Sequence, residues 1–121
     1  MVRVTIISFA VVAFVVCVLK KINSESVFIG ERIENDRLIH KSVHEKAPFI
    51  YRSYDVAFPK YYEESDNVIS AIYVVDNNYN DGASAAVDFG GVGHTFVNIH
   101  LRSALWCGFN FTIEIFGVKL K

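Results

Sequence analysis

The sequence has few of the residues that cross-link a small domain or divide a chain into several domains. It contains only two cysteines and two prolines in 121 residues. A chain of this length supports one hydrophobic core, which excludes a two-domain enzyme or a long solenoid. A basic stripe is also absent, because the 12 lysines and arginines are scattered among 13 acidic residues. Phosphate neutralisation supplies most of the affinity of proteins that bind duplexes, so we expect no direct nucleic-acid binding.

Charge is missing altogether from Thr5 to Leu19, an apolar run that follows Arg3. This pattern predicts a secretory signal peptide over residues 1–26, and the small residues of Ser24-Glu25-Ser26 place the mature start at Val27. The run is shorter than the roughly 20 residues that a spanning helix needs. We therefore expect a secreted, extracellular protein with no membrane attachment after cleavage. An uncleaved signal anchor or a buried helix is the alternative.

The remaining residues, 27–121, form a single predicted domain with 9 basic and 12 acidic residues, a net charge of −3. Cys17 lies in the predicted signal, so the mature chain would hold Cys107 alone and no internal disulfide. Cys107 is then either buried or available to link two chains into a dimer. Its neighbours Trp106 and Phe109 favour burial.

The mature chain alternates apolar and polar residues with a period of two, most clearly from Phe109 to Ile115. No mature segment sustains the period of an amphipathic helix. The pattern predicts about seven short strands and an all-β fold, an antiparallel β-sandwich with a small barrel as the alternative. The other strands are expected at Val27–Ile29, Arg37–Val43, Ile50–Phe58, Val68–Val75, Ala85–Phe89 and Thr95–Leu101.

Two of these strands can be placed from composition. Val68–Val75 is apolar on both faces, which predicts a central strand. Ile50–Phe58 carries Arg52 among apolar residues and ends before Pro59, a combination that blunts an edge strand.

The histidines do not have the spacing of a metal site. In a strand, His40 and His44 are about 13 Å apart, too far to share one ion bound at about 2 Å. His94 falls in a turn, and His100 lies on the polar side of a strand with Asn98 and Arg102. We expect no bound metal and no cofactor.

Two loops have a superficial likeness to ligand-binding loops. Asp76, Asn78 and Asn80 match the first, third and fifth positions of a calcium loop, but Asp81 and Val87 replace its glycine and bidentate glutamate, so a turn is favoured. The glycines of residues 90–93 lack the Lys-Ser/Thr of a phosphate loop and lead into a strand, which favours close backbone packing. The nucleophile motif Gly-x-Ser-x-Gly is absent, and the apolar neighbours of Cys107 make it a poor nucleophile. We therefore expect that the protein is not an enzyme.

Four residues are candidates for modification or binding. Asn110-Phe111-Thr112 is an N-glycosylation sequon, and the alternation places Asn110 on the exposed face. Trp106 is a candidate partner contact in the loop before the last strand. Tyr61 and Tyr62 either contact a partner, a small ligand or a glycan, or pack over the edge of the core. A sizeable cavity would favour the ligand hypothesis.

Five segments resemble, in order, the arthropod family named for the second multiprotein bridging factor, whose members are also described as salivary secreted peptides. They cover nearly all of the mature chain: Gly30–Val43, Val56–Pro59, Ile69–Gly82, Gly90–Ser103 and Gly108–Gly117. Two departures are Val92, where the family often has proline, and Ala104–Cys107, which replaces a stretch that is usually polar and basic.

The resemblance implies a transcriptional co-activator that acts with a partner bridging factor and a general transcription factor, and it brings no catalytic or cofactor residues. The signal-like start and the exposed sequon instead favour secretion. We therefore predict an extracellular, non-enzymatic interaction module with an unidentified protein partner. A nuclear co-activator is the first alternative, and a small-ligand or glycan binder is the second.

Overall fold

The protein is an all-β sandwich in the computed structural model, which describes residues 26–50, 52–60, 64–78 and 82–120. Seven strands follow one another along the chain: β1 (Val27–Gly30), β2 (Arg37–Lys46), β3 (Ser53–Phe58), β4 (Asn67–Asp76), β5 (Ser84–Gly90), β6 (Val97–Arg102) and β7 (Phe109–Lys119). Each corresponds to a strand predicted from the sequence. These described residues contain no helix, and thus none that could cross a membrane. Of the predicted signal, only Ser26 is among them.

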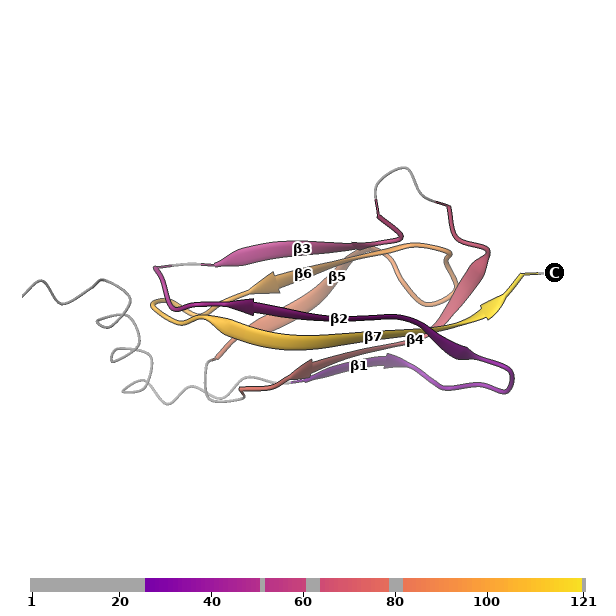
Figure 1. Cartoon of the computed structure of the whole chain (residues 1–121), viewed down its shortest axis with the longest axis horizontal. Coiled ribbons are helices and arrows are strands. Elements are labelled where there is room, and N and C mark those ends of the chain that lie inside the picture. The colour runs from indigo at the N-terminus through magenta and orange to yellow at the C-terminus, as the bar shows by residue number, and fades with distance from the viewer. Residues whose placement is uncertain (1–25, 51, 61–63, 79–81, 121) are drawn as a thin grey trace, which may run out of the picture.

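The strands form two antiparallel sheets that face each other (Figure 1). The four-stranded sheet has the order β1-β4-β7-β2, and the three-stranded sheet has the order β3-β6-β5. Two separate sheets confirm the predicted sandwich. The prediction of a central strand is confirmed, since β4 lies between β1 and β7. The prediction of an edge strand is confirmed as well, since β3 borders the smaller sheet.

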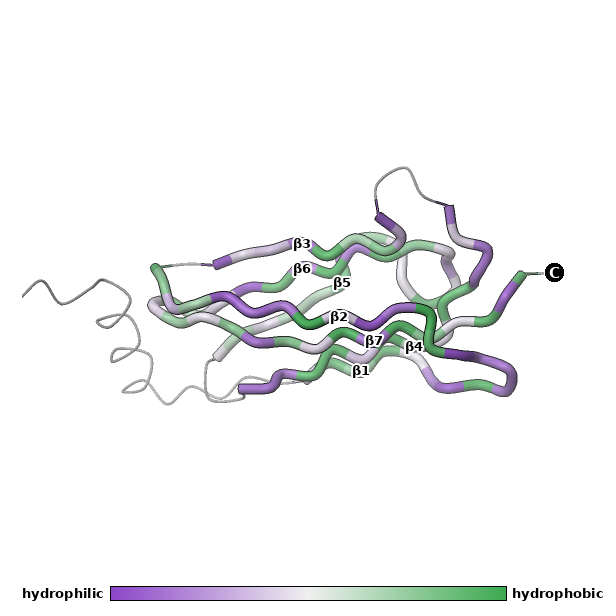
Figure 2. Tube along the Cα trace, viewed as in Figure 1, coloured by the Kyte–Doolittle hydropathy of each residue, from purple (hydrophilic) through white to green (hydrophobic). Residues whose placement is uncertain are grey.

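The core lies between the sheets and is built around β7. This strand alternates strictly over its first seven residues: every second side chain is fully buried, and the intervening ones are half-exposed. Inward residues of β4 and β6 complete the core, including Ile72, Val74, Ile99 and Leu101. Figure 2 shows hydrophobic residues concentrated along β4 and β7. The period of two thus reflects the burial of one face of each strand.

The turn between β1 and β2 is held by a single carboxylate. Asn35 has a positive φ of 68°, a conformation that asparagine tolerates. Asp36, whose side chain is 2% exposed, accepts bonds from the Arg32 guanidinium at 2.9 and 3.0 Å, the Ile33 amide and the Ser70 hydroxyl. These donors hold the pKa of Asp36 at about 2, with the Arg32 hydrogen bond as the main cause. The carboxylate therefore attaches the turn to β4.

The glycine turn between β5 and β6 attaches the smaller sheet to the larger one. The Gly93 amide donates to the Ile69 carbonyl on β4 at 2.9 Å, and the Ile69 amide donates to the His94 carbonyl at 2.8 Å. Positive φ angles at the glycines allow this close approach. Close packing against Phe96 accounts for Gly90, and positive φ angles account for Gly91 and Gly93.

Cys107 is buried, as predicted, with 1% of its surface exposed. It is disulfide-bonded in the structure of the full chain, whereas the expectation of no internal disulfide concerned the mature chain after cleavage. That expectation rested on removal of Cys17 with the signal, and Cys17 lies outside the described residues. A Cys107-linked dimer stays a prediction.

Candidate functional site

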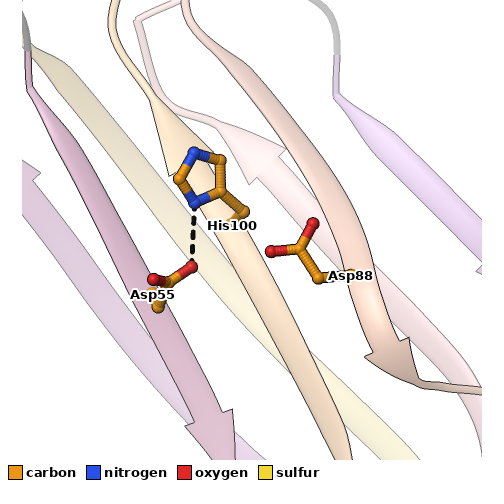
Figure 3. Close-up of side chains that lie close together, drawn as sticks. All are labelled: Asp55, Asp88 and His100. Carbon is orange, nitrogen blue, oxygen red and sulfur yellow. Dashed lines mark hydrogen bonds and ion pairs between the residues drawn. The ribbon is translucent and has the colours of Figure 1, made fainter.

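A polar cluster occupies the outer face of the three-stranded sheet (Figure 3). Asp55 on β3 lies directly opposite His100 on β6, and the Asp55 Oδ1 and His100 Nδ1 atoms are 2.8 Å apart. Asp88 reaches the same face from β5, because the register shift between Val87 and Phe89 makes Asp88 the extra residue of a β-bulge. One ligand atom from each of these three side chains lies within 4.8 Å of the other two.

Hydrogen bonds within the cluster already stabilise its charges. The His100 hydrogen bond is the main cause that lowers the pKa of Asp55. Asn98 Nδ2 donates to both aspartates at 3.4 Å. The Asp55 side chain is 60% exposed, so screening by water keeps the ion pair weak. The ligand types suit a divalent cation, but the carboxylates of Asp55 and Asp88 are exposed to solvent.

A second polar row lies on the inward side of β2. His40 Nε2 is 3.0 Å from the Ser42 hydroxyl, and the same hydroxyl is 2.7 Å from His44 Nε2. We call His40, Ser42 and His44 the histidine–serine row. Burial is the main cause that lowers the pKa of both histidines, which keeps them neutral at pH 7. Both rings lean toward Ser42, and the sequence prediction that the two histidines are too far apart to share one ion stays a prediction.

A groove of about 780 Å³ runs along this row, between the edge strands of the two sheets. Its opposite wall is β3, where Phe58 contacts the His40 ring at 5.2 Å between centroids and Tyr54 contacts the His44 ring at 5.5 Å. A second groove of about 760 Å³ lies at one end of the three-stranded sheet and is bordered by Lys60, Phe89 and Phe96.

The outer face of the four-stranded sheet carries a third feature, which we call the outer aromatic row. It contributes one side chain from each strand: Phe28, Tyr73, Phe116 and Leu38. The Phe28 and Tyr73 rings meet edge to face at 5.3 Å, and the Tyr73 and Phe116 rings are 5.1 Å apart. Phe28 is 62% exposed and Leu38 is 45% exposed.

The sequence predictions for single residues fall on different parts of the molecule. Asn110 is half-exposed on the outer face of β7, where Asn77 Nδ2 donates to its Oδ1 at 3.0 Å and to Thr112 at 2.8 Å. Trp106 is half-exposed with a positive φ of 69°, and its amide donates to the Ile50 carbonyl. Tyr61 and Tyr62 lie outside the described residues.

The calcium-like turn is described only in part. The Asp76 carboxylate accepts a bond from the Asn78 amide at 2.8 Å, the geometry of an Asx turn. Asn80 and Asp81 lie outside the described residues. This bond supports the favoured interpretation of the segment after β4 as a turn.

Two antiparallel sheets with an aromatic outer face on one and a polar outer face on the other define a small β-sandwich domain. The family model of Transcription activator MBF2 matches residues 29–117, from within β1 to within β7. The chain belongs to this family, and the resemblance seen in its sequence is confirmed. No curated protein and no solved structure matches the chain.

Proposed function

We propose that the chain is a small, secreted, non-enzymatic module that binds another protein through the outer aromatic row. The observation that carries the proposal is the exposure of Phe28 and Leu38 on one sheet face, on either side of the half-buried Tyr73 and the buried Phe116. Soluble monomers rarely leave contiguous apolar patches uncovered, and such patches mark interaction sites.

The row has the composition of an interface centre. Aromatic residues and arginine are enriched where protein interfaces are fully buried. Here the Arg32 guanidinium stacks on the Phe116 ring at 3.8 Å while Asp36 holds it in place. Val43, 61% accessible, lies on the same face of β2 but is separated from Leu38 by Lys41. Aromatic side chains have only two rotatable χ angles, so little conformational entropy is lost when a partner covers them.

Secretion is supported by the sequence of residues 1–26 and by the position of the sequon. The hydrogen bond from Asn77 uses the oxygen of the Asn110 amide, and a glycan attaches to the nitrogen. Half-exposure of Asn110 and Thr112 on the outer face leaves the sequon accessible. A glycosidase-induced mobility shift that disappears in Asn110→Gln would support modification.

A non-enzymatic role is supported by the separation of the polar groups. Ser42 and His44 face inward, whereas Asp55 and His100 lie on the outer face of the opposite sheet. The serine–histidine contact and the histidine–aspartate pair therefore do not combine into a catalytic triad.

A photo-crosslinking experiment tests the interface. A benzoylphenylalanine at position 28 of the full chain is irradiated in the secreted medium of the producing tissue, and the matched control carries the same residue at Ala86, exposed on the outer face of the other sheet. We expect one protein adduct at position 28 that excess wild-type protein competes away and excess Phe28→Ser does not. Equal adducts at both positions, or none at position 28, would contradict the proposal.

The second candidate function is a nuclear co-activator, and membership of the transcription activator family favours it. The two roles require different compartments, so localisation separates them. The endogenous protein is measured in nuclei and in saliva, haemolymph or conditioned medium, and the amino terminus of the purified form is sequenced. Secreted protein that starts near Val27 supports our proposal. Nuclear protein with an intact Met1 supports the co-activator.

The third candidate is a small-ligand or glycan binder. The groove bordered by Phe89 and Phe96 favours it, since aromatic side chains at a groove bind sugars and apolar ligands. A glycan array probed with the wild type and with Phe96→Ser tests this role, and an array without signal would exclude glycans.

A further inference from the structure

The histidine–serine row is unusual because polar residues occupy inward positions of a strand. His40, Ser42 and His44 pair with Ile115, Ile113 and Phe111 of β7, which all point into the core. The polar residues lie farther out, on edge strand β2, where the groove keeps them partly open to solvent. Groups from the surface can therefore reach both imidazoles.

The side chains converge although the backbone separates them. Both Nε2 atoms lie within hydrogen-bond distance of one hydroxyl oxygen, so they are less than 6 Å apart. Their rings rest against Phe58 and Tyr54 of the opposite sheet, which fixes the direction in which each nitrogen points. Two preoriented imidazole nitrogens aimed at one point are the start of a coordination site.

We propose that His40 and His44 bind one divalent transition-metal ion in this groove, with the Ser42 hydroxyl and water as the remaining ligands. Neutral imidazole is the preferred ligand of Zn²⁺, Cu²⁺ and Ni²⁺, whereas Ca²⁺ and Mg²⁺ prefer oxygen. A bound ion requires nitrogen distances of about 2.0 to 2.1 Å, so the two Nε2 atoms must come within about 4 Å of each other. Metal binding therefore requires the two imidazole rings to move closer together than their shared hydrogen bonds to Ser42 hold them.

Two lysines limit the strength of the site. Lys60 lines the same groove, and the Lys46 ammonium lies 4.8 Å from the centre of the Tyr54 ring. Their positive charges oppose a divalent cation. We therefore expect a site that exchanges its ion with solvent, and not a structural centre on which folding depends.

The test is calorimetric titration of the full chain, without a polyhistidine tag, with ZnCl₂ and separately with CaCl₂. We expect saturable binding of one zinc ion per chain and no calcium binding. His40→Ala and His44→Ala should each weaken zinc binding by about 10- to 100-fold or more, since even outer-shell losses reach that size. Melting curves without metal confirm that each variant is folded.

The matched controls are His94→Ala, in a turn, and His100→Ala, in the cluster of the opposite sheet. Both should bind zinc like the wild type. Loss of binding in His100→Ala would assign the ion to Asp55, Asp88 and His100 and overturn the proposal. So would full binding in both row variants, or no zinc binding at all. As a second measurement, Co²⁺ should shift the ring proton resonances of His40 and His44 and leave those of His94 in place.

Discussion

Replacing Ile113 with alanine tests whether β7 is the centre of the core. Ile113 is fully buried and pairs with Val74 on one side and Ser42 on the other. The change removes three carbons at about 0.8 kcal/mol each, or about 2.4 kcal/mol in transfer free energy. The cavity left behind adds to this loss, so the free energy of unfolding should fall by about 3 to 4 kcal/mol.

Glu114→Ala is the matched control, one residue further along the same strand. Glu114 is half-exposed on the outer face, opposite Tyr73 and Lys41. Substitutions at such positions usually change the unfolding free energy by less than about 0.5 kcal/mol. The two variants therefore lie on the same strand and differ in the face they probe.

The measurement is urea denaturation followed by circular dichroism, with thermal melting as a second assay. For a domain of this size, about 3 to 4 kcal/mol corresponds to a drop of roughly 12 to 30 °C in Tm. A loss below about 1 kcal/mol in Ile113→Ala, or an equal loss in Glu114→Ala, would refute the inside-outside assignment of β7 and with it the packing of the two sheets.

Three further predictions concern the turns and the polar cluster. The folded pKa of Asp36 is about 2 against an ordinary value of about 3.9, so the contribution of its carboxylate to stability is fully present above about pH 4 and is lost as the pH falls toward 2. Asp36→Asn should lose this acid-dependent contribution. Identical urea midpoints from pH 5 to pH 2 in the wild type would contradict the prediction. Gly30→Ala should destabilise the protein more than Gly93→Ala. Both glycines have a positive φ, but an added Cβ at Gly30 overlaps the Ser70 carbonyl oxygen, whereas one at Gly93 meets nothing within 4 Å. Thermal melting measures the difference, and the backbone alone should cost about 1 to 2 kcal/mol at Gly93. Asp55→Asn should leave the urea midpoint nearly unchanged, since the carboxylate is mostly exposed, and a clear drop would show that the cluster is structural.

The strands could be predicted because each is determined by its own alternation. Phe109 to Ile115 alternates in sequence and in burial, and all seven predicted strands occur. The composition of Val68–Val75 and Ile50–Phe58 was enough to assign a central and an edge position, because two buried faces need apolar residues on both sides of a strand. Local patterns of this kind act over fewer than ten residues and can be read directly.

The sites could not be predicted in the same way, because they depend on pairing between distant strands. Asp55 and His100 are 45 residues apart in the sequence, and the pattern within each strand does not reveal how β3 pairs with β6. Asp88 joins them only through a β-bulge, a single extra residue that periodicity does not show. The outer aromatic row likewise takes one side chain from each of four strands whose order is not the order of the sequence. Cross-strand register, and not composition, assembles these groups.

In the histidine–serine row, two side chains converge although their backbone positions lie far apart. A separation of four residues in a strand does place two Cα atoms about 13 Å apart. Each imidazole, however, extends several ångströms from its Cα, and Ser42 between them offers one oxygen to both. A spacing rule for ligands on a strand must therefore include the residue in between: a small hydroxyl leaves room for two long side chains to lean together, and a bulky apolar residue would keep them apart. The same reasoning explains why an edge strand is the place for such a row. On β7 the inward positions are enclosed by β2, β4 and the opposite sheet, so a neutral imidazole there would lose its water without compensation, whereas on β2 the groove keeps one side wet.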